Sequence, residues 1–154
     1  MSFVRALRLD SLDPYAGYGA VFIRLLVGHR LIVGTADNVF SAARMHEFAA
    51  FLARHGFPAP LASAHVSAYA QFLCGILIVL GAFVRPAAAV MAVNFAVALG
   101  MVHLGRPYLE NFDALAMLAG SLFLLLHGAG ALSADAALAK RRPTIIVSGG
   151  RVAA

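Results

Sequence analysis

The chain has 154 residues, of which 62% are hydrophobic and only 12% are charged, and its formal net charge is +5. Its mean hydropathy of +0.85 excludes a soluble globular domain and indicates an integral membrane protein. The excess of basic residues is explained by membrane topology and by contact with anionic membrane lipids, so no nucleic-acid partner is expected.

Four apolar runs each have close to the roughly 20 residues that a membrane-spanning helix needs. They cover about residues 15–33, 61–83, 87–104 and 112–126. The first run is interpreted as a mature helix and not as a signal peptide, because Arg24 and Arg30 interrupt it and no small-residue cleavage site follows. The pattern predicts an all-α, antiparallel four-helix bundle in one domain over residues 1–142, and a flexible cytoplasmic tail over 143–154.

Basic residues predict the orientation of these helices, since short loops rich in Lys and Arg stay in the cytoplasm. One side of the membrane collects the larger set, namely Arg5, Arg8, Arg85, Lys140, Arg141, Arg142 and Arg151. The opposite side has three arginines diluted by three acidic residues, namely Arg44, Arg54, Arg106, Asp37, Glu47 and Glu110. Both termini are therefore expected in the cytoplasm.

The first outer loop contains an amphipathic stretch over residues 42–55. Its apolar residues recur at helical spacing and form one stripe, namely Met45, Phe48, Ala49 and Leu52. Gly56 is a plausible C-cap, and the segment 57–60 is a stiff, proline-containing elbow into the second apolar run. We predict a short interfacial helix that forms a lid over the outer mouth of the bundle.

Arg24 is the most informative residue of the first run. It belongs to a stripe of mainly small or polar residues, namely Gly17, Ala20, Arg24, Gly28, Leu31 and Thr35. A charge at this depth is costly and needs a partner inside the protein, so it marks a candidate functional site. Gln71 in the second run and Asn94 in the third lie at a similar depth and are its candidate partners.

A second group of titratable residues shares a depth near the outer mouth: His29, Arg30, His65, His103, Glu110 and Asp113. Such a group can relay protons. Two simpler interpretations stay open. Arg30 and Asp37 can form a water-bridged ion pair on one helix, and each histidine can be an interfacial side chain bonded to backbone or lipid headgroups.

Redox groups carried by the chain itself are not expected. Cys74 is the one cysteine, so no thiol pair is available for disulfide exchange. His65 and His103 are the one interhelical pair that we nominate for haem, but their spacing does not favour it. No metal site is predicted, because no His-x-x-x-His pattern occurs.

Several motifs resemble those of the DoxX family, over about residues 24–135. They are RLLVG at 24–28, FLARHGFPAP at 51–60, GILIVLGAFVR at 75–85, and GAGALSAD at 128–135. The resemblance implies a four-helix protein of the bacterial inner membrane, linked in some members to quinone-dependent oxidation of sulfur compounds or to membrane oxidoreductase complexes. The family pattern often has Glu where this chain has Gln71, and Lys where it has Asn38.

The first hypothesis is a membrane subunit of a quinone-linked oxidoreductase system. It would bind a quinone or a similar lipophilic molecule within the bundle and act at most as an accessory subunit with a redox partner. The candidate ligand-binding residues are Arg24, His29, His65, Gln71, Asn94, His103 and Asp113. The alternatives are a non-redox binding or transport protein for a small lipophilic molecule, and a structural assembly subunit whose small residues also allow a homo-oligomer.

Overall fold

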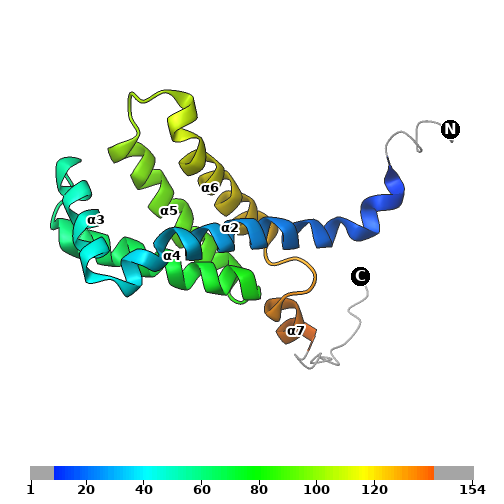
Figure 1. Ribbon diagram of the computed structural model, residues 1–154. Helices are drawn as coiled ribbons and strands as arrows, with labels where there is room; N and C mark the ends of the chain where they lie inside the picture. The colour runs from blue at the N-terminus through cyan, green and yellow to red at the C-terminus, as the bar shows by residue number, and fades with distance from the viewer. Residues whose placement is uncertain (1–8, 141–154) are drawn as a thin grey trace, which may run out of the picture.

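The computed structural model describes residues 9–140, and all regular secondary structure in this range is helical. Four helices are long and apolar enough to cross a membrane. They are α2 (Ala16–Phe40), α4 (Pro60–Leu80), α5 (Val84–Val102) and α6 (Tyr108–His127) (Figure 1). The four predicted long helices are confirmed, and the first continues beyond residue 33 to Phe40.

Three shorter elements complete the described chain. These are the 3-10 helix η1 (Asp10–Tyr15), the helix α3 (Ala42–Arg54) and the helix α7 (Ala134–Lys140). The α3 helix and the α5–α6 loop lie at one end of the molecule, and α7 lies toward the other (Figure 1). The predicted tail over 143–154, together with Arg5, Arg8, Arg141, Arg142 and Arg151, lies outside the described residues.

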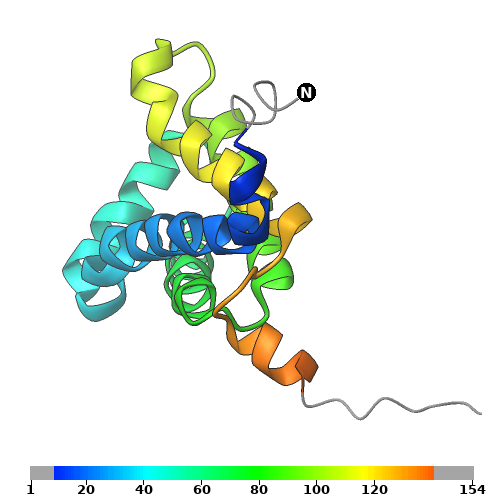
Figure 2. The same ribbon diagram turned by 90° about the vertical axis from the view of Figure 1, so that its right-hand side faces the viewer.

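The long helices pack in two pairs, with α2 against α4 and α5 against α6 (Figures 1 and 2). Glycines allow the first pair to approach closely. A Cβ added to Gly28 of α2 would lie 2.8 Å from the carbonyl oxygen of Gly75, and one added to Gly75 of α4 would lie 3.0 Å from that of Gly28. The two backbones therefore touch at this crossing, as small residues allow between membrane helices.

The core lies between these pairs, where apolar side chains from all four long helices are fully buried. Its largest members include Leu31, Ile78, Met91 and Leu124. Many large apolar side chains on the outer faces are exposed instead, among them Phe22, Leu26, Val66, Val93 and Leu126. Buried polar groups and exposed large apolar side chains are the distribution expected of a protein that is surrounded by lipid.

The α3 helix packs its apolar stripe against protein. Met45, Ala49 and Leu52 are buried in a small cluster with Ala64 and Ala68 of α4. The predicted amphipathic helix is therefore present, and its Ser41 N-cap accepts a hydrogen bond from the Arg44 backbone. Its position in the membrane interface stays a prediction.

Arg24 joins three parts of the chain through its guanidinium. Its Nε donates to the Ile78 carbonyl at 2.9 Å, and Nη2 donates to the Val79 carbonyl at 2.9 Å. Nη1 donates to carbonyls of the loop after α6, at 3.0 Å for Ala129 and 3.2 Å for Leu132. Carbonyls at the end of a helix lack partners within it, so Arg24 satisfies the C-terminus of α4 and holds the loop. We call this set of bonds the Arg24 clamp.

The loop held by the clamp and the first turn of α7 also cap two helices. The Asp135 carboxylate accepts hydrogen bonds from the backbone N–H groups of Phe83 at 2.8 Å and Val84 at 3.1 Å, at the start of α5. Ser133 Oγ accepts from the Ala136 N–H and so caps the start of α7. The GAGALSAD segment is thus a structural joint, in which the loop bonds back to α2 from Ala131 N–H to the Gly17 carbonyl.

The clamp predicts a large loss of stability on Arg24→Ala. Four carbonyls would lose a charged donor, and those of Ile78 and Ala129 are buried, so we expect the free energy of unfolding to fall by about 3 kcal/mol. Thermal unfolding in mild detergent measures this. The control is Arg85→Ala, because exposed Arg85 donates to a single carbonyl, that of Leu126, and its loss should cost less than about 1 kcal/mol. Equal effects of both variants would contradict the clamp.

The helix crossing predicts opposite signs for two glycine substitutions in α2. Gly28→Ala should destabilise the protein by about 1–3 kcal/mol, because the new methyl group meets the backbone of α4. Gly19→Ala should stabilise it by up to about 1 kcal/mol, because nothing lies within 4 Å and alanine is the better helix former. The same thermal measurement decides, and a neutral Gly28→Ala would argue against the close crossing.

Candidate binding site

A groove of about 690 Å³ lies between α3, α4 and α5. Its walls are mainly apolar, and aromatic rings from α3 and the following elbow close one side, namely Phe48, Phe51 and Phe57. Val90, Val93, Val97 and Met101 of α5 form the opposite wall. Clefts of this size and polarity are typical of sites for small lipophilic molecules. We call this cavity the apolar groove.

A short chain of hydrogen bonds crosses the wall of the apolar groove. Gln71 Nε2 donates to Ser67 Oγ at 3.0 Å, and Ser67 Oγ donates to Asn94 Oδ1 at 2.9 Å. All three side chains line the groove and are half-buried. The bonds connect α4 with α5 and place two amide groups beside an otherwise apolar space.

The predicted partnership of Arg24 with Gln71 and Asn94 is wrong. The guanidinium bonds backbone carbonyls at the C-terminal end of α4, whereas the two amides bond Ser67. The physical reason is that a helix end and a glycine loop offer several strong acceptors together, which side-chain periodicity does not reveal. Arg24 lines neither the apolar groove nor the neighbouring chamber.

A second, smaller chamber of about 250 Å³ adjoins the groove and is more polar. Gln71, Phe48 and Phe95 line both cavities and so form the wall between them. Arg30 and Asp113 line the polar chamber and pair in bidentate fashion, with Nη2 to Oδ2 at 2.6 Å and Nε to Oδ1 at 3.2 Å.

This ion pair corrects the interpretation of Arg30 that involved Asp37. Asp113 of α6 takes up the guanidinium across the helix interface, and the Arg30 side chain folds over Gly34, where a Cβ would collide with it. Asp37 instead contributes to the field at Arg44, whose pKa is raised above its ordinary value, first by the hydrogen bond to Glu47 and then by these two carboxylates.

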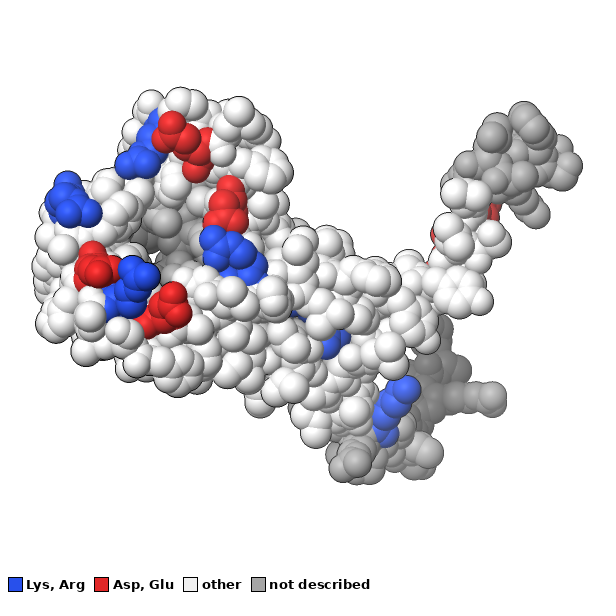
Figure 3. Space-filling model, viewed as in Figure 1, with Lys and Arg blue, Asp and Glu red and all other residues white. Residues whose placement is uncertain are grey.

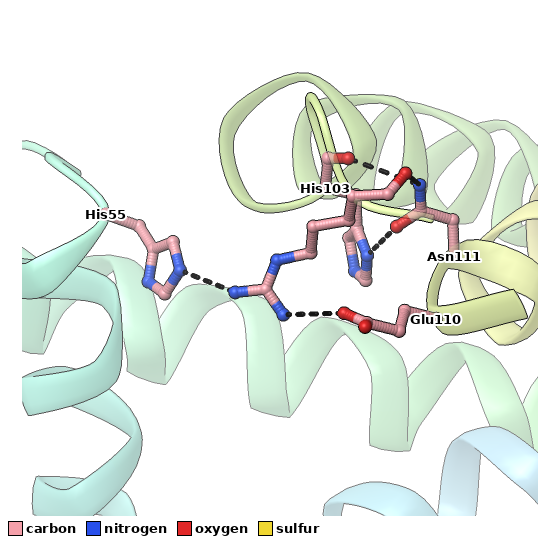
Figure 4. Close-up of polar contacts among 5 residues, drawn as sticks. His55, His103, Glu110 and Asn111 are labelled. Atoms are coloured by element: carbon pink, nitrogen blue, oxygen red, sulfur yellow. Dashed lines mark hydrogen bonds and ion pairs between the residues drawn. The ribbon is translucent and has the colours of Figure 1, made fainter. Parts of the chain in front are cut away.

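Charged side chains surround a hollow at the end of the molecule that carries α3 and the α5–α6 loop (Figure 3). Arg106 of this loop bridges two elements there, with Nη2 3.4 Å from His55 Nε2 and Nη1 3.9 Å from a Glu110 carboxylate oxygen (Figure 4). The His103 Nδ1 lies 2.7 Å from Asn111 Oδ1. His103 also lines the apolar groove, so this rim orients a titratable ring at the groove's edge.

The other two predicted histidines lie elsewhere. His65 is exposed, stacks on Tyr69, and its Nδ1 is 2.8 Å from the carbonyl of Leu61 in its own helix. His29 is exposed on α2. Neither lines the groove or the polar chamber, whereas His103 lines the groove. Among residues 9–140, no group of three His, Cys, Asp or Glu side chains is arranged to hold a metal ion.

Of the seven predicted site residues, the structure therefore gathers Gln71, Asn94, His103 and Asp113 around two adjoining cavities. Sequence reasoning missed Ser67 as the link between the amides. The i,i+4 spacing of Ser67 and Gln71 was the available signal, because it places the two side chains on one helix face. The role of Arg106 in the α5–α6 loop and of Asn111 in the first turn of α6 had no comparable signal.

A comparison with known protein families shows which family this chain belongs to. The sequence model of DoxX matches residues 19–104, which is more than half of the chain and includes the three helices of the apolar groove. The chain belongs to the DoxX family. No match was found among curated proteins or among solved structures. In this DoxX protein, α6 and the clamp's loop lie beyond the matched residues.

The Arg30–Asp113 pair predicts a measurable coupling between α2 and α6. A double-mutant cycle with Arg30→Met and Asp113→Asn should give about 1 kcal/mol of coupling in thermal stability, because the contact is bidentate and interhelical. The Arg44–Glu47 pair is the control, since it is similarly exposed but lies three residues apart on one helix. Its coupling should be clearly smaller than that of the Arg30–Asp113 pair. A smaller value for the first cycle than for the second would contradict the interhelical pairing.

Proposed function

We propose that this DoxX protein is a membrane subunit of a quinone-linked oxidoreductase system that binds a quinone or a similar lipophilic molecule in the apolar groove. The groove itself carries the proposal, since it combines an apolar volume of about 690 Å³ with two amide side chains on one wall. Family membership supports a membrane protein of the kind often associated with oxidoreductase and quinone systems.

A flat ring suits the walls of the groove. Aromatic and branched apolar side chains line both faces, and such surfaces bind an apolar ring by excluding water from it. Gln71 and Asn94 would orient the ring through its oxygens, with His103 at the rim as a further donor. Arg24, His29 and His65 are left out of this site, because none of them lines the groove.

Proton movement would use the polar chamber next to Gln71. Asp113 is the acid that lines this chamber, and it forms an ion pair with Arg30. A carboxylate one wall away from the ligand's polar end is placed to exchange protons with it through Gln71 or through water. Electrons must come from a partner, because the chain has a single cysteine and no thiol pair. The protein is therefore proposed as an accessory subunit.

The proposed setting is the bacterial inner membrane, with an antiparallel bundle and both termini in the cytoplasm. The charged end that surrounds the hollow would then face outward, with α3 as a lid in the interface (Figure 3). A non-redox binding or transport protein for a lipophilic molecule is the alternative. It is favoured by the same groove, and it would use the amides to hold a ligand whose oxidation state does not change.

Filling the groove tests the proposal. Ala98 lines it, whereas Ala96 is exposed on the same helix and does not. Wild type, Ala98→Phe and Ala96→Phe are purified in mild detergent, and their organic extracts are compared by mass spectrometry for quinones and other lipophilic compounds. We expect a near-stoichiometric ligand in wild type and Ala96→Phe, and at least a tenfold loss in Ala98→Phe.

The outcomes separate the two functions. A quinone that is lost only in Ala98→Phe supports the quinone-linked subunit. A different lipophilic molecule with the same pattern favours the non-redox alternative. Equal extracts from the two folded variants, or no lipophilic compound in wild type and no binding of added quinone, would overturn a site in the groove.

A further inference from the structure

Ser67 controls which hydrogen-bonding groups the apolar groove offers to a ligand. Its hydroxyl accepts from Gln71 Nε2 and donates to Asn94 Oδ1. Among the described residues, neither amide has a further hydrogen-bond partner. The Asn94 amide nitrogen and the Gln71 carbonyl oxygen therefore have no partner among these residues, and both side chains line the groove, where a ligand or water can bond to them.

One amide nitrogen and one amide oxygen stay without a partner whichever way the hydrogen bonds run through Ser67. A serine hydroxyl has a single hydrogen, so it can donate to the oxygen of only one amide. If both side-chain amides are flipped, so that nitrogen and oxygen exchange places, Asn94 donates to Ser67 and Ser67 donates to Gln71. The groove then offers the Asn94 oxygen and the Gln71 nitrogen, which is again one acceptor and one donor group.

We infer that the groove selects the reduced, hydroxyl-bearing form of its lipophilic ligand, a quinol or other phenol, over the carbonyl form. This inference rests on the proposed function of the groove. A hydroxyl donates to the free amide oxygen and accepts from the free amide nitrogen, so both are satisfied. A carbonyl can only accept, and it leaves the amide oxygen covered without a donor, which is costly away from water.

The first measurement compares three probes with one ring skeleton. They are a short-chain 1,4-benzoquinone, its hydroquinone, and the dimethyl ether of that hydroquinone. Calorimetric titration of the full chain in lipid nanodiscs, without oxygen, gives their dissociation constants. The hydroquinone should bind about tenfold more tightly than the quinone, which corresponds to about 1.4 kcal/mol. The ether, which has no donor, should bind no more tightly than the quinone.

The second measurement removes the amides. The double variant Gln71→Met with Asn94→Leu keeps the side-chain volumes similar, and the quinol-to-quinone preference should fall from about tenfold to less than threefold. Ser63→Ala is the matched control, since Ser63 also lines the groove but donates to the Pro58 carbonyl. It should leave the preference unchanged. If the double variant does not fold, Gln71→Met alone should give an intermediate preference.

The failures are distinguishable. Equal or tighter binding of the quinone in wild type, or a preference that survives loss of both amides, overturns the inference and leaves the groove as a binding site. No binding of any probe, together with no effect of Ala98→Phe on the extract, overturns the proposed function and the inference with it.

Discussion

The burial of one guanidinium organises this structure. Arg24 is 3% exposed in the first long helix, and it is tolerated there because backbone carbonyls from two other segments surround it. Those carbonyls lie at the end of α4 and in the loop after α6, where regular helical hydrogen bonding stops, so the charge and the acceptors stabilise each other. The clamp fixes where α4 ends and where the chain returns after α6, and Asp135 then caps α5 from the first turn of α7, directly after this loop. The register of three spanning helices depends on this joint.

Stability and binding therefore occupy different parts of the molecule. The clamp and the glycine crossing at Gly28 and Gly75 hold α2 against α4, and neither lines the apolar groove. The groove opens where α3, α4 and α5 diverge, and its polar wall depends on side chains alone. This separation makes the amides of Gln71 and Asn94 the residues whose chemistry defines the ligand in the proposed site.

Much of the fold followed from composition and periodicity. Apolar runs long enough to span a bilayer predicted the four long helices, and the stripe from Met45 to Leu52 predicted α3. For the site, depth along the helices correctly selected Gln71 and Asn94 as neighbours of a polar seam. Depth alone misplaced Arg24, His29 and His65, because residues at one depth can still point to different neighbours around the helix axis.

The sequence by itself determined that the chain is a helical membrane protein, since this follows from local composition. It also determined that a buried arginine needs partners, because burying an unpaired charge is costly. Only the tertiary structure decided which partners these are. The partners of Arg24 come from α4 and from the loop after α6, which are adjacent only in the folded protein. Arg30 likewise pairs with Asp113 across the interface between α2 and α6. Every residue has the same backbone carbonyl, whatever its side chain. The sequence pattern therefore does not predict which carbonyls will accept hydrogen bonds from a buried side chain in the folded protein.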